Sequence, residues 1–260
     1  MILTYDLTWI ILLPVLGALV VYATPKNIAR WLALGFAAAT FVLSLVIFFR
    51  IAVSGYNFGD LNHLADPVHT GWINFQGGHF KIDYFLGVDG LSLPMVILNA
   101  LLTMLAVIGG WEKDRVKEYL ALLLLLEAGV MGVFMAIDLL LFFLFWEVEL
   151  APMFLLIGIW GNEAIKHGMP GRIYSAWKFL LYTFFGSVFM LAGILLLYFK
   201  VGLNTADMQI LSQHLISGNA QIPVLGITMS FQLLTFLLIF LAFAVKIPMF
   251  PFHTWLPDAH

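Results

Sequence analysis

Apolar residues gather along this chain in runs long enough to cross a membrane. A helix needs about 20 predominantly apolar residues to span a hydrocarbon slab roughly 30 Å thick. Seven such runs can be counted, and each predicts a membrane-spanning helix. They lie at about Leu7–Ala23, Ala29–Val53, within Asp83–Gly110, Glu118–Ala136, Leu139–Gly161, Ile173–Phe199 and from about Gly226 onward.

Polar segments separate these runs. A long loop, Ser54–Phe80, is rich in Gly, Asn and His, and Asn162–Arg172 is a shorter loop with two glycines and a proline. Thr205–Ser217 has helical spacing but is too polar to cross a membrane, so we expect it to lie at the surface. The last run is interrupted by prolines, and the chain stops soon afterwards at His260. We therefore expect this chain to be a fragment of a longer protein.

Composition agrees with an all-α, polytopic membrane helical bundle. Hydrophobic residues make up 62% of the chain and charged residues 10%, and the mean hydropathy is +1.00. Soluble domains are nearer 45–50% apolar and about 25% charged. A net charge of -3 argues against a nucleic-acid partner. The chain has no cysteine, which excludes disulfides and thiolate-ligated iron–sulfur or zinc sites.

The histidines argue against a haem held in the membrane. His63, His69, His79, His167 and His214 lie in connecting segments, and His253 and His260 follow the last run. None lies in the middle of a run opposite another, which argues against a bis-histidine haem. If the function of this protein involves electron transfer, we expect that step to take place on another chain.

Basic residues predict the orientation of the chain, because cytoplasmic loops carry an excess of Lys and Arg. Loops on the side of the N-terminus carry Arg50, Lys81 and Lys200. Loops on the other side carry Lys26, Arg30, Lys113, Arg115, Lys117, Lys166 and Arg172. The second side is therefore expected to be cytoplasmic, with the N-terminus outside. The first run has no basic residue before it, which favours a retained span over a signal peptide.

Two acids lie near the middle of the fifth run. Glu147 is eight residues from Leu139, roughly 12 Å along a helix, so its carboxyl lies near the centre of the slab. A charge there costs about 2.5–3.5 kcal/mol, which makes an intramembrane carboxyl a functional candidate. Glu149 is two residues further on and points about 200° away, so the two acids form no dyad. Pro152 has no N–H for the carbonyl of Val148, which frees an acceptor between the acids. A structural ion pair between helices is the competing interpretation.

Three further groups lie in or beside the runs. Glu127, midway along the fourth run, is a possible second relay group or a polar contact between helices. Asp138 lies at the end of a run and is expected to be an interfacial or N-cap residue. Lys178 lies five residues inside the sixth run, with Tyr174 and Tyr182 one turn to either side. The alternative is that the side chain of Lys178 extends along the helix and places its charge at the cytoplasmic surface.

Lys246 has the most specific surroundings. Thr228, Gln232 and Thr235 fall within roughly 40° of its direction on a helix, which predicts one polar stripe suited to a hydrated path. Pro248 and Pro251 then break the helix, and broken helices in membranes usually adjoin a cavity or an ion site. His253 follows the break, and histidine titrates near neutral pH, which suits proton transfer. It is equally consistent with an interfacial histidine beside Trp255.

Three stretches resemble the antiporter-like membrane subunits of respiratory complex I, most closely the M-type subunits. They read FWEVELAPMFLLIGIWG, AWKFLLYT and AFAVKIPMFPFHTWLPDAH, and LGVDGLSLPMVIL matches more weakly. The second half of the chain therefore carries most of the resemblance. Related subunits of multisubunit sodium/proton antiporters resemble Lys-Ser-Ala after the equivalent lysine, whereas this chain has Lys246-Ile247-Pro248.

The resemblance implies a fold with inverted repeats, each holding one broken helix. Residues 1–117 would form an N-terminal three-helix segment with the long polar loop, and residues 118–260 most of the first repeat. Glu147, Lys178 and Lys246 match the family's key glutamate and two lysines, whereas Glu127 and Glu149 match no such position.

The resemblance also implies a function. The chain would be a proton-translocating subunit of an NADH-quinone oxidoreductase in the cell membrane, without a redox or metal site of its own. NADH, FMN, iron–sulfur clusters and quinone would bind to other subunits. Its partners would be the lipid bilayer and other membrane-arm subunits, especially neighbouring antiporter-like chains. A subunit of a sodium/proton antiporter is the alternative.

Overall fold

The computed structural model describes most of the chain. The described residues are 6–58, 64–75, 80–166, 168–201, 204–217, 221–224 and 227–259. They form two compact units, which are described separately. The first unit comprises the chain up to Thr70, Tyr84–Ile137 and Leu144–Met153. The second comprises Gly71–Asp83, Asp138–Phe143 and the chain from Phe154 onward.

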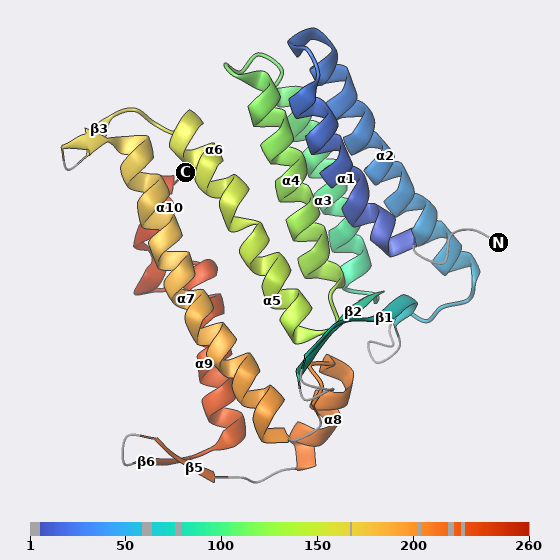
Figure 1. Cartoon of the computed structure of the whole chain (residues 1–260), viewed down its shortest axis with the longest axis vertical. Coiled ribbons are helices and arrows are strands. Elements are labelled where there is room, and N and C mark those ends of the chain that lie inside the picture. Colours follow the sequence, from blue (N-terminus) through green and yellow to red (C-terminus); the bar gives the residue numbers. More distant parts are fainter. Residues whose placement is uncertain are drawn as a thin grey trace. The chain divides into compact units, whose positions relative to one another are not determined.

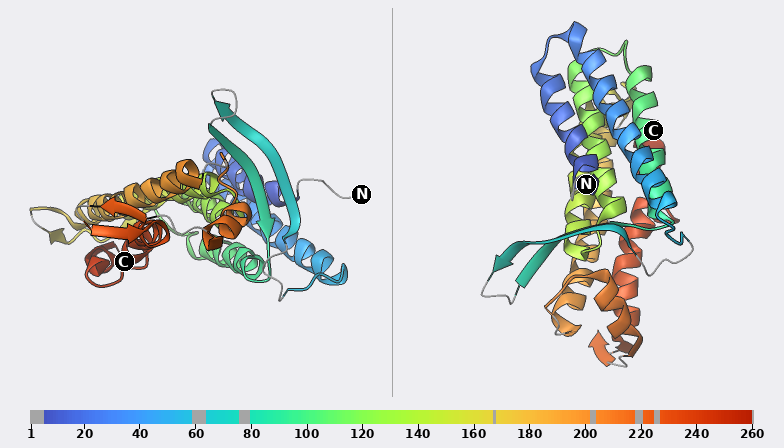
Figure 2. Two further views of the ribbon diagram at one scale, coloured as in Figure 1. Left: turned by 90° about the horizontal axis from the view of Figure 1, so that it is seen from below. Right: turned by 90° about the vertical axis from the view of Figure 1, so that its right-hand side faces the viewer.

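Four long helices make up most of the first unit (Figure 1). They are α1 (Asp6–Ala23), α2 (Lys26–Val53), α3 (Ser92–Gly109) and α4 (Val116–Met135). Helix α1 packs against α2 and α4, and α3 packs against the same two helices (Figure 2). Small residues let the helices approach closely, as is common in membrane bundles. Ala29, Ala33 and Ala37 recur every four residues on α2 and are fully buried in a cluster with Leu120 and Leu124 of α4.

A β-hairpin occupies the region that the sequence predicted as a loop followed by the start of the third span. Its strands are β1 (Ala65–Phe75) and β2 (Phe80–Val88). The third span begins at Ser92 and lies within the predicted region Asp83–Gly110. Strand β2 is buried on both faces toward its end, and the backbone N–H of Ile137 donates to the carbonyl of Phe85 at 2.9 Å. The apolar residues of β2 thus pair as a strand instead of forming the first turns of the third span.

One arginine joins three elements of the first unit. Arg50, in the last turn of α2, forms ion pairs with Asp6 at the start of α1 and with Asp66 in β1. The Asp6 side chain is only 3% exposed, so its charge depends on this partner. The ion pairs fix the ends of α1 and α2 to the hairpin.

The fifth span is interrupted at its centre, whereas the sequence predicted only a carbonyl of Val148 without a donor there. Helix α5 runs Leu139–Val148 and helix α6 runs Leu150–Trp160, with Glu149 between them. The backbone bonds around the interruption are long, with the N–H of Glu149 3.3 Å from the carbonyl of Phe145. The missing N–H of Pro152 explains the break, because no donor reaches the carbonyl of Val148 from that position.

The long helix α7 (Gly171–Val201) and the shorter helix α9 (Phe231–Lys246) form the centre of the second unit. Gly186 of α7 lies against Ala242 and Val245, and Gly193 lies against Leu238 and Ile239, so the two helices run antiparallel. The strands and short helices of this unit are β3 (Ile165–Lys166), β4 (Met169–Pro170), α8 (Met208–Ser217), β5 (Gln221–Val224), β6 (Ile227–Ser230), η2 (Phe252–Trp255) and α10 (Leu256–Ala259).

Helix α9 is shorter than the seventh predicted span. It begins at Phe231, after a hairpin of β5 and β6, whereas the expected start near Gly226 lies outside the described residues. Thr228 is part of β6, so the prediction that it shares a helical stripe with Lys246 was wrong. The predicted break is confirmed, because the helix ends at Lys246. At about 1.5 Å per residue, its 16 residues reach roughly 24 Å.

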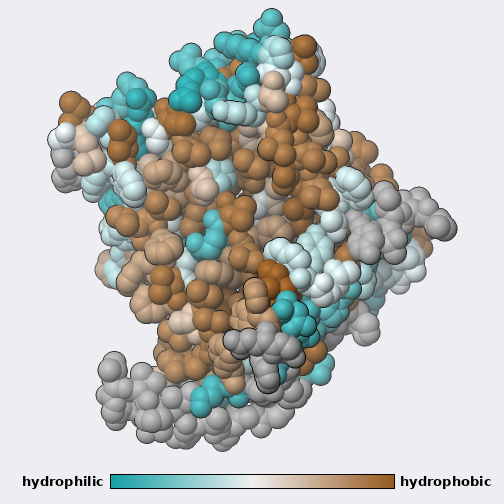
Figure 3. Space-filling view, in the orientation of Figure 1, coloured by the Kyte–Doolittle hydropathy of each residue, from teal (hydrophilic) through white to brown (hydrophobic). Residues whose placement is uncertain are grey.

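The helices have the length and the surface of membrane spans. Six described segments are long and apolar enough to cross a membrane, and α9 is a seventh, shorter apolar helix. Large hydrophobic side chains face outward: Trp31, Phe49 and Leu181 are 66%, 62% and 61% exposed. Figure 3 shows hydrophobic side chains over the middle of the helices and hydrophilic ones at the upper ends of α1–α4. The prediction of a polytopic membrane helical bundle is confirmed.

Candidate functional site

The charged groups singled out from the sequence fall in both units. Glu127, Glu147 and Glu149 belong to the first unit, whereas Lys178, Lys246 and His253 belong to the second. Their geometry is therefore described within each unit. Four of the seven histidines, His63, His79, His167 and His260, lie outside the described residues.

Glu147 lies in the last turn of α5, next to the interruption of the span. Its Oε1 atom is buried and has no hydrogen-bond partner among the described residues. A buried polar oxygen without a partner loses its interaction with water and gains nothing in return. The interruption and this oxygen together give the middle of the span a group ready to accept a proton or a hydrogen bond.

Glu149 lies between the two half-helices and contacts α4. A Cβ atom added to Gly129 would lie 3.2 Å from the Cβ atom of Glu149, so the glycine makes room for this part of the span. A Cβ atom at Gly132 would overlap the ring of Phe145. Two glycines one turn apart on α4 therefore allow the interrupted span to pack closely against that helix.

Glu127 is the most deeply buried acid of the first unit. Its side chain is 1% exposed, and neither carboxyl oxygen has a partner among the described residues. The nearest polar contact involves its backbone, because the side-chain amide of Asn99 on α3 donates to its carbonyl at 3.4 Å. Native interiors leave few polar groups in this state, so each one calls for an explanation.

Asp138 lies between two spans and caps α5, as the sequence predicted. Its Oδ1 atom accepts hydrogen bonds from the backbone N–H groups of Leu140 and Leu141, both at 2.9 Å. Its Oδ2 atom accepts from the N–H of Asp83 at 3.3 Å, and Asp83 in turn pairs with Lys81. Burial raises the pKa of Asp138 above its ordinary value of 3.8, although the three N–H donors act in the opposite direction.

Lys178 has an acidic partner that sequence reasoning missed. Its Nζ atom lies 2.8 Å from Oδ2 of Asp258 in α10, and the two side chains are 19% and 21% exposed. The ammonium group also lies 5.8 Å from the centre of the Tyr174 ring. Tyr182, one turn further along α7, shares a hydrogen bond of 2.8 Å with Thr254. The predicted stripe of Tyr174, Lys178 and Tyr182 therefore faces the segment that follows the helix break.

Lys246 is the last residue of α9, and the chain beyond it donates hydrogen bonds to two carbonyls at the end of this helix. Pro248 offers no N–H to the carbonyl of Ala244, and the N–H of Met249 bonds to it at 2.8 Å. The indole N–H of Trp255 donates to the carbonyl of Val245 at 2.8 Å. The end of α9 is thus capped by its own continuation.

Two other groups complete the description of this region. His253 is exposed and stacks on Phe250 with 5.7 Å between ring centres, which leaves its two predicted roles open. Thr235 is 4% exposed on α9, and its hydroxyl has no partner among the described residues. Without Thr228, the predicted polar stripe on α9 therefore comprises Gln232, Thr235 and Lys246.

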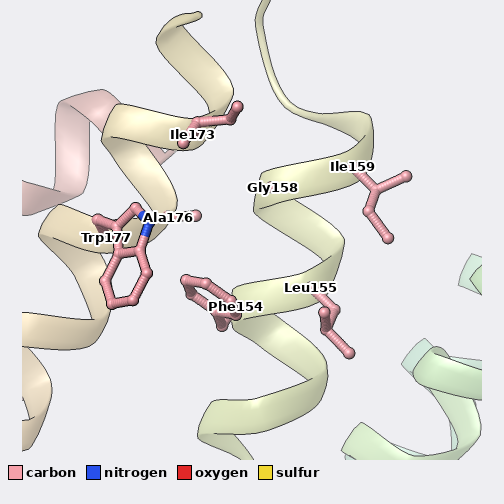
Figure 4. Close-up of a pocket in the computed structure, with 7 residues that line it drawn as sticks. All are labelled: Phe154, Leu155, Gly158, Ile159, Ile173, Ala176 and Trp177. Carbon is pink, nitrogen blue, oxygen red and sulfur yellow. The ribbon is translucent and has the colours of Figure 1, made fainter. Parts of the chain in front are cut away.

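An apolar groove of about 220 Å³ lies between α6 and α7. Figure 4 shows Phe154 and Trp177 pointing toward one another across it, while Leu155 and Ile159 point away from α7. The rings of Phe154 and Trp177 meet edge to face at 5.5 Å. No titratable side chain lines the groove, so it contributes no proton-carrying group.

Comparison with known proteins agrees with this arrangement. The family model described as NADH:quinone oxidoreductase/Mrp antiporter, transmembrane, matches residues 136–260. NADH-quinone oxidoreductase subunit M of Rhodobacter capsulatus is 41% identical over 92% of this chain and 43% of its own length. NAD(P)H-quinone oxidoreductase chain 4 1 of a Picosynechococcus species is 39% identical over 98% of this chain and 43% of its own length. The chain thus spans less than half the length of these relatives.

Solved structures give the same result. A chain of respiratory complex I from Thermus thermophilus with bound NADH superposes with a TM-score of 0.76 at 29% identity, over 98% of this chain and 46% of that one. A chain of an archaeal membrane-bound sulfane sulfur reductase shares the fold, with a TM-score of 0.72 at 22% identity over 98% of this chain and 36% of that one. The resemblance found in the sequence motifs is confirmed: residues 136–260 match the model of the NADH:quinone oxidoreductase/Mrp antiporter membrane family, and the chain is similar to the M-type subunits over nearly all of its length.

Proposed function

We propose that this chain is part of a proton-translocating membrane subunit of a redox-driven NADH-quinone oxidoreductase. Electron transfer would take place on other subunits, which would bind NADH, FMN, iron–sulfur clusters and quinone. The subunit itself would move protons and would act as part of a translocase. Its partners would be the other membrane-arm subunits, above all the neighbouring antiporter-like chains.

The observation that carries this proposal is the end of α9 at Lys246. A helix of 16 residues stops inside a segment that is otherwise apolar, and it places a lysine at the break. Ionisable groups inside membranes are costly and generally mark ion or proton pathways. Broken helices supply the binding sites of many transporters.

Glu147 is proposed as the acid that controls this lysine. In this mechanism, Glu147 pairs with Lys178 or with a base on a neighbouring subunit. Separation of that pair changes the local charge, and the affinity of Lys246 for its proton changes with it. Lys246 then passes the proton onward, and His253, which lies in the segment after the break, takes part in this transfer. The buried oxygen of Glu147 supports this role, because it lies beside the interruption in the span.

Glu127 and Glu149 are proposed as secondary groups of the path. Glu127 lies in the interior of the helix bundle with both carboxyl oxygens buried, and Glu149 lies in the interruption itself. A relay through several carboxyl groups would shorten the distance of each proton transfer.

The proposed location is the inner cell membrane, with the N-terminus on the outer side. The unequal distribution of Lys and Arg between the two sets of loops supports this orientation. A thiol or protease accessibility map of the loops in sealed vesicles would test it.

The decisive experiment is redox-driven proton uptake by inverted membrane vesicles that contain the complex with Glu147→Gln. The full-length subunit is used, and assembly and electron transfer are measured on the same sample. We expect proton uptake per electron to fall while electron transfer persists. The matched control is Glu163→Gln, which makes the same change at a side chain that is 75% exposed in a loop. Unchanged uptake in Glu147→Gln would refute the role of this acid.

A sodium/proton antiporter subunit is the second candidate, because the family model includes Mrp antiporters. The same vesicles distinguish the two functions. An antiporter would move protons in response to a sodium gradient without any electron donor. The proposed pump requires the donor and continues when choline replaces sodium.

A further inference from the structure

The segment that follows the helix break folds back onto α7. We call Phe252–Ala259 the returning segment; it comprises η2 and α10. Its polar side chains meet α7 at two points one turn apart, the ion pair of Lys178 with Asp258 and the hydrogen bond of Tyr182 with Thr254, both 2.8 Å long. An apolar contact lies between them, since the rings of Phe179 and Trp255 are 5.4 Å apart. The returning segment is therefore fastened to α7 along one face.

The same segment closes the end of α9. Trp255, which is 5% exposed, donates its indole N–H to the carbonyl of Val245, one residue before Lys246. If the returning segment left α7, this bond would break and the carbonyls at the end of α9 would be exposed. The position of the segment on α7 thus determines whether the end of α9 is covered.

The ion pair of Lys178 and Asp258 differs from the surface pair nearby. Its two side chains are about one-fifth exposed, whereas Arg172 and Glu163, which pair at 2.5 Å, are 35% and 75% exposed. Charges interact more strongly where water is scarce. Removing one partner from such a pair also leaves the other charge poorly solvated. We therefore expect the first pair to hold its elements together and the second to contribute little.

The register between α7 and α9 places this ion pair just beyond the lysine. Gly186 lies against Ala242 and Val245, and Gly193 lies against Leu238 and Ile239. Continued in the antiparallel direction, this register puts Lys246 level with about Thr183. Lys178 is five residues closer to the start of α7, roughly 7.5 Å along the helix. The ion pair therefore lies past the end of α9, where a proton approaching from that side would enter.

We propose that Asp258 is a positioning residue of the proton path, which holds the returning segment closed over the end of α9 through its ion pair with Lys178. With the pair formed, Ala244 and Val245 at the end of α9 are buried, at 4% and 1% exposed, and Lys246 itself is half-buried. When the pair separates, the returning segment lifts and water reaches the lysine, which then gains or loses its proton. This inference rests on the proposed function, because that function makes Lys246 the proton carrier.

Accessibility to a thiol reagent tests the closure directly. Residues 1–260 have no cysteine, so labelling of the peptide that contains Ala244→Cys reports on the end of α9. Ala244 is 4% exposed and small, which makes the change mild. The assembled complex with the full-length subunit is treated with a membrane-impermeant maleimide, and labelling of this subunit is read by mass spectrometry. We expect Asp258→Asn to raise the labelling rate about tenfold, since local opening becomes easier.

Proton uptake per electron gives the second measurement. We expect Asp258→Asn to lower it by more than half, with electron transfer retained. The exchange of charges, Lys178→Asp with Asp258→Lys, should restore the labelling rate toward that of the parent, which a general packing defect would not allow; only labelling is measured in this variant, because the proposed function pairs Glu147 with Lys178. Glu163→Gln, which breaks the exposed pair with Arg172, should change neither measurement.

Two results would overturn the proposal: parental labelling and uptake in Asp258→Asn, or no restoration of the labelling rate by the exchange. If Asp258→Asn does not assemble, Thr254→Val decides, because it removes only the neighbouring hydrogen bond and should raise labelling to a smaller extent. A Lys246→Met variant separates this proposal from the proposed function. Normal uptake in Lys246→Met would refute the function, whereas its loss combined with normal uptake in Asp258→Asn would refute only the role of Asp258.

Discussion

Replacing Glu127 by methionine is expected to stabilise the protein. The carboxyl is 1% exposed and its two oxygens have no partner among the described residues. Leaving a buried polar group unpaired costs about 1–3 kcal/mol. Methionine has a similar length and volume and an unbranched chain, so a volume-conserving change adds little strain. We expect the free energy of unfolding to rise by about 1–3 kcal/mol.

The assay is thermal stability of the full-length subunit as a fluorescent-protein fusion in detergent, followed by size-exclusion chromatography of heated samples. Glu127→Gln is the matched control, because an amide keeps polar atoms at the same place and should bring no such gain. A methionine variant that is no more stable than the glutamine variant would contradict the reasoning and would mean that the carboxyl has a partner in the folded protein. If Glu127 also relays protons, both variants should pump less, so the gain in stability would accompany a loss of function.

Three further changes have defined outcomes. Because the pKa of Asp138 is raised by folding, its contribution to stability is complete below pH 3.8 and is lost as pH rises through the folded-state pKa. Asp138→Asn should therefore flatten the fall of Tm with pH in a series of thermal scans from pH 4 to 8. Gly132→Ala places a methyl group on the Phe145 ring and should lower stability by about 1–3 kcal/mol, whereas a steady Tm would mean that the ring can move. Ser230→Ala removes the cap at which its hydroxyl accepts from the N–H of Leu233, and should cost about 1 kcal/mol in the same thermal assay.

The spans could be predicted from the sequence because burial in lipid leaves long apolar runs. The break after Lys246 could be predicted as well, since Pro248 and Pro251 remove specific backbone donors whatever surrounds them. The hairpin of β1 and β2 could not, because its first strand reads as a polar loop and its second as the start of a span. Strand pairing depends on contacts far apart in sequence, and periodicity describes only one segment at a time.

The candidate site was predictable in the same uneven way. Lys178 and Lys246 stood out because a charge inside an apolar run is rare. Asp258, the partner of Lys178, follows 80 residues later in a polar stretch of the sequence. Acidic residues are common in such stretches, so the sequence pattern does not single it out. The useful signal would have been that a buried base needs a buried acid, which leads to a search for one near the break.

Because α9 is short, proton uptake by the proposed pump should depend on the thickness of the bilayer. Its helix extends roughly 24 Å, about 6 Å less than an average hydrocarbon core. A thinner bilayer would bring the lipid headgroups toward the break, and a thicker one would bury the returning segment in acyl chains. Such hydrophobic mismatch costs fractions of a kcal/mol per Å. Coupling between electron transfer and proton uptake should therefore depend on the length of the lipid chains in which the complex is reconstituted.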